Sequence, residues 1–145
     1  MTDPAPATPP KPIGKVILID DDVVDHKLCE RLVRRSGMVE TFLGFLSAEE
    51  ALGYLATQDM PATDAIFLDI NMPRMNGFEF LEAATERLGE NFARMVVFML
   101  TTSLNPVDMA RAQSYPVVKE YVSKPLALED LERLSAVLHS DDPAA

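Results

Sequence analysis

The sequence is short of several features that mark particular classes of protein. Cys29 is its only cysteine, so no disulfide can form within the chain. The neighbours Leu28, Leu32 and Val33 favour a small buried side chain over a nucleophile at this position. No apolar run approaches the ~20 residues needed to cross a bilayer. The first residues also lack the basic and apolar segments of a secretory signal. We therefore expect a cytoplasmic protein without a membrane segment.

Lysine and arginine are scarce relative to acidic residues. The chain has 13 basic and 23 acidic residues, and its formal net charge is -10. Such a charge repels nucleic-acid phosphates and anionic lipid surfaces, and no basic run interrupts it. We therefore expect protein partners, and neither nucleic acid nor a membrane surface.

Proline is concentrated at the start of the chain. Residues 1–12 contain five prolines and almost no large apolar side chain, which predicts a disordered tail. Residues 13–140 have the length and composition of one domain, and residues 141–145 form a second short tail. We find no linker that leads to a second domain, so we expect a stand-alone module.

Within the domain, short apolar runs alternate with segments of helical periodicity. The apolar runs predict strands near 15–20, 41–46, 64–70, 95–100 and 119–123. Helical spacing follows each run, near 24–33, 47–57, 78–88, from 105 onward, and 126–138. Five strand–helix units joined by short loops predict an α/β doubly wound parallel sheet with helices on both faces.

Polar side chains follow four of these predicted strands. They are Asp20–Asp22, Asp69, Thr101–Ser103 and Ser123–Pro125. The carboxyl ends of parallel strands meet at one edge of a sheet, where such folds place their chemistry. We therefore expect these groups to converge on one site.

The acidic members of this set suggest a metal ion. Two carboxylates about 4 Å apart repel by roughly 4 kcal/mol at an effective dielectric near 20, so a cluster needs a cation. Oxygen ligands favour a hard ion such as Mg²⁺. Alone, Asp20–Asp22 is equally consistent with a solvated loop and helix cap, and the addition of Asp69 favours the metal site.

The other two groups suggest an anion beside the metal. The Thr101 hydroxyl and the Lys124 ammonium are hydrogen-bond donors, which a metal alone would not require. A metal, a hydroxyl and a lysine together complement a transferring phosphoryl group. One carboxylate would then be the nucleophile, because carboxylates form acyl phosphates.

Four segments in order resemble one known family. They are VILIDDD (16–22), FLDINMPRMNG (67–77), FMLTTS (98–103) and YVSKPL (121–126). The chain resembles a response regulator receiver domain of bacterial two-component signalling, similar to the chemotaxis regulators. The resemblance covers residues 13–140. It implies a flavodoxin-like, five-stranded parallel sheet with strand order 2-1-3-4-5.

The resemblance also implies roles for the acidic residues. Asp69 would be the phosphoacceptor, and it would receive the phosphoryl group from a phosphohistidine. Asp20 and Asp21 would hold Mg²⁺ together with Asp69 and the backbone carbonyl of Asn71.

Further roles are implied for the donors and for an aromatic residue. Lys124 would pair with the phosphoryl oxygens, with a cis peptide bond to Pro125. Thr101 would move to bind the phosphoryl group, and Tyr121 would turn inward with it. An aromatic residue in a short strand is also consistent with simple packing.

The implied activity is that of a signalling switch, not an enzyme, with only slow self-dephosphorylation. Its partners would be a histidine kinase or histidine phosphotransfer protein and an unknown downstream protein, and a homodimer stays open. Two alternatives remain. A haloacid-dehalogenase-type phosphatase also uses Asp, Thr or Ser, Lys and Mg²⁺, but it needs an acid where this chain has Asn71. A pseudo-receiver would share the fold without phosphorylation, although such modules usually lack one of the site residues.

Overall fold

The computed structural model describes residues 12–57, 63–102 and 104–140. The two predicted tails, 1–12 and 141–145, lie outside these ranges except for Pro12. Within the described ranges, no helix is both long and apolar enough to cross a membrane.

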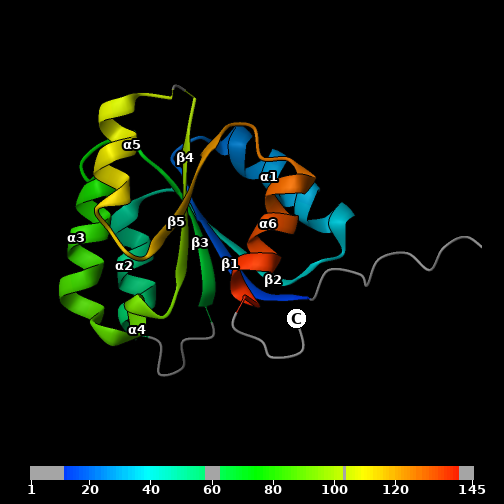
Figure 1. The fold of residues 1–145 in the computed structure, drawn as a ribbon, viewed down its shortest axis with the longest axis horizontal. Coiled ribbons are helices and arrows are strands. Elements are labelled where there is room, and N and C mark those ends of the chain that lie inside the picture. Colours follow the sequence, from blue (N-terminus) through cyan, green and yellow to red (C-terminus); the bar gives the residue numbers. More distant parts are fainter. Residues whose placement is uncertain (1–11, 58–62, 103, 141–145) are drawn as a thin grey trace, which may run out of the picture.

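One sheet of five strands forms the middle layer (Figure 1). The strands are β1 (Ile13–Ile19), β2 (Val39–Phe45), β3 (Thr63–Asp69), β4 (Val96–Thr101) and β5 (Val118–Ser123). Their order in the sheet is β2-β1-β3-β4-β5, and every neighbouring pair is parallel. The predicted doubly wound sheet and its strand order are confirmed.

Helices cover both faces of the sheet. They are α1 (Val23–Ser36), α2 (Ala48–Thr57), α3 (Gly77–Leu88), α4 (Glu90–Ala93), α5 (Pro106–Gln113) and α6 (Leu128–Leu138). Helices α1 and α6 lie on one face, and α2 to α5 lie on the other (Figure 1). Helix α4 was not predicted, because a four-residue helix is too short to show a helical period. It is separated from α3 by Gly89, which has a positive φ of 54°.

Alternate residues of each central strand enter two separate hydrophobic clusters. In β1, Ile17 and Ile19 join the cluster under α2 to α5, whereas Val16 and Leu18 join the cluster under α1 and α6. Because successive side chains of a strand point to opposite faces, a strand buried on both faces must be apolar throughout. This explains the continuous apolar runs of the sequence. Cys29 is buried in the second cluster, as expected of a packing residue.

The helix starts at the carboxyl edge of the sheet are fixed by side-chain caps. The Asp22 carboxylate accepts a hydrogen bond from the Val24 N–H (2.8 Å) at the start of α1. Asn76 and Glu79 form a capping box at the start of α3. Caps of this kind satisfy backbone N–H groups that have no partner within the helix. They also fix where the loops after β1 and β3 end, and these loops carry the acidic residues.

Candidate functional site

Three carboxylates meet at the carboxyl edge of the sheet. Asp69 ends β3, and Asp20 directly follows β1, whose Ile19 is paired with Leu68 of β3. Asp20 and Asp69 are buried, whereas Asp21 is exposed. One oxygen from each of Asp20, Asp21 and Asp69 lies within 4.8 Å of the others. The two loops are therefore joined into one acidic group, as the strand-end argument predicted.

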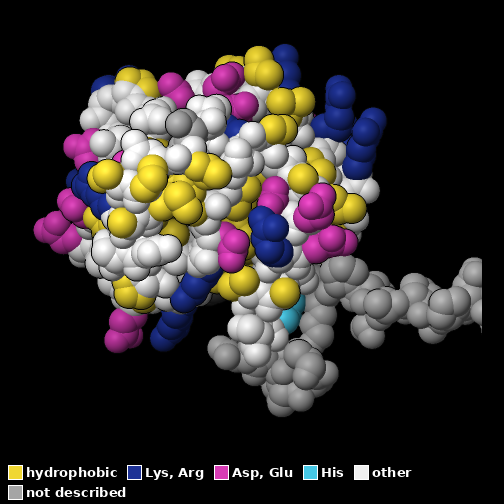
Figure 2. All heavy atoms as spheres, turned by 45° about the horizontal axis from the view of Figure 1, so that its top comes forward, with side chains coloured by type: hydrophobic (Ala, Val, Ile, Leu, Met, Phe, Trp, Pro, Cys, Tyr) yellow, Lys and Arg dark blue, Asp and Glu magenta, His cyan; other side chains and the backbone are white. Residues whose placement is uncertain are grey.

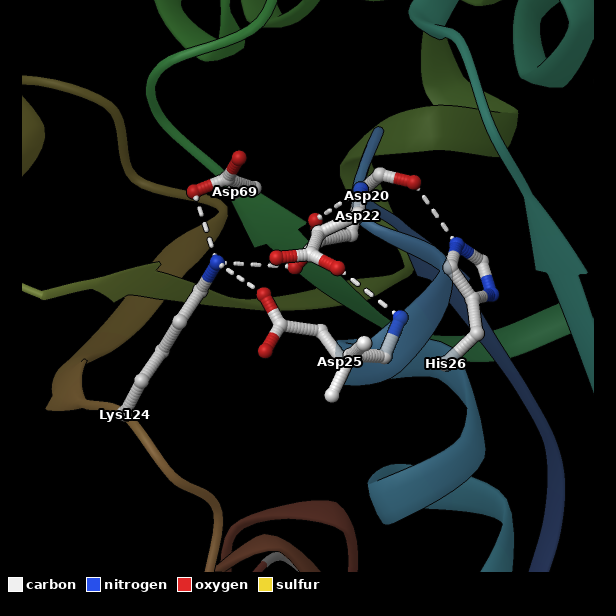
Figure 3. A network of polar contacts seen from close by, with 7 residues as sticks. Asp20, Asp22, Asp25, His26, Asp69 and Lys124 are labelled. Carbon is white, nitrogen blue, oxygen red and sulfur yellow. Dashed lines mark hydrogen bonds and ion pairs between the residues drawn. The ribbon is translucent and has the colours of Figure 1, made fainter.

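The ammonium of Lys124 lies beside two members of this group, Asp20 and Asp69 (Figure 3). Its Nζ is 2.8 Å from a carboxylate oxygen of Asp20 and 3.2 Å from one of Asp69. A third oxygen, from Asp25, is also 2.8 Å away. The lysine side chain is only 12% exposed, so these contacts are shielded from water and from screening by salt.

The backbone after β5 brings Lys124 to this position. Thr101 and Ser123 are register partners at the ends of β4 and β5, and the Lys124 N–H donates to the Thr101 carbonyl (2.8 Å). The Lys124–Pro125 peptide bond is cis, as the resemblance implied. The Thr101 side chain is buried beside the site. Tyr121 is half-buried and packs against the cluster under α2 to α5. Burial is the main cause of its raised pKa, and a hydrogen bond with the Thr101 side chain lowers that pKa in part.

Burial and charge shift the acidities of the site in opposite directions. Burial raises the pKa of Asp20 to about 6, although its hydrogen bond with Lys124 acts against this. Burial also raises the pKa of Asp69, again against the effect of Lys124. For Lys124, burial lowers the pKa, but hydrogen bonds with Asp20 and Asp25 and the negative charges of Asp69 and Asp20 together raise it. The lysine therefore stays charged near neutral pH.

The remaining predicted residues lie around this centre. Asn71 is exposed in the loop after β3, two residues beyond Asp69. The Asp22 side chain caps α1, and it is not part of the three-carboxylate group. Ser103 lies outside the described residues.

Two residues near the site had been given no role in it from the sequence. Asp25 and His26 both lie in the first turn of α1, where a polar residue is usually part of a solvated face. The His26 Nε2 is 2.7 Å from the Asp20 backbone carbonyl (Figure 3). A Cβ at Gly44 of β2 would collide with the His26 ring, so the glycine makes room for it. The signal available in the sequence was that both residues lie about one helical turn after the acidic run Asp20–Asp22.

A glycine close to Asp69 also belongs to the site. A Cβ at Gly77 would lie 2.7 Å from the backbone oxygen of Asp69 and 3.0 Å from Cα of Ile70. Both neighbours are backbone atoms, which cannot rotate away. Only glycine therefore allows the start of α3 to pack against the end of β3.

Comparison with known proteins agrees with this geometry. The family model of the response regulator receiver domain matches residues 16–135. The chain belongs to the response regulator receiver domain family. A crystal structure of a two-component response regulator from Cytophaga hutchinsonii superposes with a TM-score of 0.84 at 30% identity, covering 90% of this chain and 99% of that one.

Relatives of this receiver domain differ in overall length. It is 30% identical to the two-component response regulator ARR17 of Arabidopsis thaliana, over 85% of this chain and 83% of that protein. It is also 26% identical to hybrid signal transduction histidine kinase L of Dictyostelium discoideum, over 87% of this chain. The match spans only 7% of that kinase, so the receiver domain corresponds to a small part of it.

The acidic group of this receiver domain fits a hard divalent cation. Asp20, Asp21 and Asp69 offer carboxylate oxygens, and the group contains no thiolate or imidazole ligand. Oxygen-only sites suit Mg²⁺ or Ca²⁺ better than softer metals. A divalent cation would also reduce the repulsion among these carboxylates.

Proposed function

We propose that this receiver domain accepts a phosphoryl group on Asp69 from a phosphohistidine of a histidine kinase or histidine phosphotransfer protein. One observation carries the proposal. Asp69 lies both within the three-carboxylate group and 3.2 Å from the Lys124 ammonium, so a carboxylate that could attack phosphorus has a possible cation site and an ammonium beside it.

The transfer step uses these residues as follows. A carboxylate oxygen of Asp69 attacks phosphorus, the new O–P bond forms, and the P–N bond to the donor imidazole breaks with its electron pair passing to nitrogen. Lys124 donates to a phosphoryl oxygen, and the Thr101 hydroxyl donates to another once Thr101 has moved. Asp20, Asp21, Asp69 and the Asn71 carbonyl would hold Mg²⁺, which when bound offsets negative charge on the carboxylates and the phosphoryl group.

We propose that phosphorylation shifts the populations of two conformers of the domain, and that another protein binds one of them preferentially. The phosphoryl anion favours the conformer in which Thr101 reaches it, and Tyr121 moves inward with Thr101. The domain would act as a switch, by protein contact or by passing the phosphoryl group onward. It would not be a metabolic enzyme.

An exposed apolar surface next to the site supports contact with a partner. Val23, Val24 and Leu28 of α1 are 52%, 61% and 48% exposed. Helix α1 begins directly after the acidic loop, and Figure 2 shows exposed hydrophobic side chains among charged ones on this side of the molecule. Neighbouring exposed apolar groups on one helix are compatible with a protein–protein contact there.

Intact-mass spectrometry after incubation with acetyl phosphate and Mg²⁺ tests the proposal. We expect a gain of one phosphoryl group, lost in Asp69→Asn and kept in Asp22→Asn, which alters an adjacent acidic residue outside the site. The absence of an adduct on the unaltered chain would favour the pseudo-receiver. Rapid sustained hydrolysis of p-nitrophenyl phosphate would favour a phosphatase of the haloacid dehalogenase type.

A further inference from the structure

Asp25 is a fourth carboxylate at the site, and the three-carboxylate group does not include it. It lies on α1, one turn after the acidic loop, and its side chain is 27% exposed. Its oxygen lies 2.8 Å from Lys124 Nζ, as close as the oxygen of Asp20 and closer than that of Asp69 at 3.2 Å (Figure 3). Asp25 therefore faces the ammonium and not the metal position.

The three carboxylates around Lys124 match its capacity to donate. An ammonium group has three N–H donors, and Asp20, Asp25 and Asp69 each place an oxygen within ion-pair distance of it. Burial raises the pKa of Asp25, but its hydrogen bonds with Lys124 and Asp20 and the nearby positive charge together outweigh burial and lower the pKa, so Asp25 is ionised near neutral pH. A phosphoryl group on Asp69 would thus meet a lysine whose N–H donors already point to carboxylates.

We propose that Asp25 is a positioning residue that holds Lys124 in the unphosphorylated site and competes with the phosphoryl group for it. The inference rests on the proposed function of Asp69. Two effects act in the same direction. Asp25 engages a donor that a phosphoryl oxygen needs, and its negative charge repels the incoming dianion in a poorly hydrated site. Asp25 therefore weakens binding of the phosphoryl group and so determines how readily Asp69 carries it.

Binding of beryllium fluoride, a non-covalent mimic of the phosphoryl group, measures this competition. Isothermal titration calorimetry of the full chain at saturating Mg²⁺ should show about tenfold tighter binding to Asp25→Asn than to the unaltered chain. Asp22→Asn is the matched control, because it removes the same charge nearby and asparagine also caps a helix well. It should change the affinity by less than about twofold. Asp25→Ser repeats the test with a second uncharged side chain.

The coupling between Asp25 and Lys124 separates competition from a merely structural effect. In a Lys124→Gln background, Asp25→Asn should raise the affinity by clearly less than in the unaltered chain, because there is no ammonium to release and only the charge repulsion is removed. Three results would overturn the inference: weaker or unchanged binding in Asp25→Asn, an equal gain in Asp22→Asn, or a gain of the same size without Lys124. Weaker binding would mean that Asp25 directs the lysine toward the phosphoryl group.

Failure of the proposed function gives a different pattern. If the unaltered chain does not bind beryllium fluoride, or if Asp69→Asn binds it equally well, then the role of Asp69 is wrong. If binding depends on Asp69 but is unaffected by Asp25→Asn, only the inference about Asp25 is wrong.

Discussion

The two hydrophobic clusters and the carboxyl edge of the sheet are built from the same strands but filled in opposite ways. Phe67 and Phe98, in neighbouring strands, are fully buried, with ring centroids 6.0 Å apart. A few residues further along these strands, buried Asp69 and Thr101 replace the apolar side chains. Apolar burial stabilises the fold, whereas crowded carboxylates cost free energy unless a cation compensates them. The comparison predicts that the clusters determine stability and that the edge determines function.

The strongest test of this comparison is one substitution in a hydrophobic cluster and one at the carboxyl edge. Phe67→Ala should lower the free energy of unfolding by about 3–5 kcal/mol, because it removes a fully buried ring and leaves a cavity. Asp21→Asn, at the exposed part of the edge, should change it by less than about 1 kcal/mol without metal. Urea denaturation with EDTA present measures both. Similar losses of unfolding free energy in the two variants would contradict the claim that the clusters, and not the edge, determine stability.

Metal binding should make the edge contribute to stability. At a free Mg²⁺ concentration 100 times the Kd, binding adds about 2.7 kcal/mol to the free energy of unfolding. The gain should be mostly lost in Asp21→Asn but kept in Asp22→Asn, and EDTA should reverse it. An equal gain in both variants would place the metal somewhere other than the three-carboxylate group.

The pH dependence of the metal-free protein should reveal the cost of the buried acids. The pKa of Asp20 is raised from 3.8 to about 6, so between these values the folded state binds more protons than the unfolded state. The free energy of unfolding should therefore fall, by about 2 kcal/mol, as pH rises from 4 to above 6. Asp69, whose pKa is also raised, acts in the same direction, whereas the lowered pKa of Asp25 acts only at lower pH.

Denaturation midpoints between pH 4 and 7 test this slope, and Asp20→Asn should reduce it. Stability that rises with pH over this range would contradict the assignment. Saturating Mg²⁺ should also flatten the slope, because protons and the cation compete for the same carboxylates.

Two glycine substitutions should have the smallest effects on stability, and these effects should have opposite signs. Gly44→Ala should lower the free energy of unfolding by about 1 kcal/mol, because the new Cβ collides with the His26 ring. Gly53→Ala, in the exposed middle of α2 with nothing within 4 Å of a Cβ, should raise it by up to about 1 kcal/mol. NMR shifts of the His26 ring should change only in Gly44→Ala. A His26 ring unaffected by Gly44→Ala would show that the contact is not needed.

Most of the fold could be predicted from the sequence, because strands buried on both faces leave continuous apolar runs. The convergence of Asp20, Asp21 and Asp69 followed from strand ends meeting at one edge. The contact of Asp25 with Lys124 could not be predicted, because it joins residues 99 positions apart and depends on the rotation of α1. The space that Gly44 leaves for His26 is likewise a property of tertiary packing, with no local sequence pattern.

The central claim is that Asp69 alone among the four carboxylates is the nucleophile. Borohydride reduces an aspartyl phosphate to homoserine, so peptide mass spectrometry after treatment with acetyl phosphate, Mg²⁺ and borohydride locates the phosphoryl group directly. The account predicts homoserine at position 69 and unaltered aspartate at positions 20, 21 and 25. Homoserine at any of those three positions, with aspartate retained at 69, would contradict it.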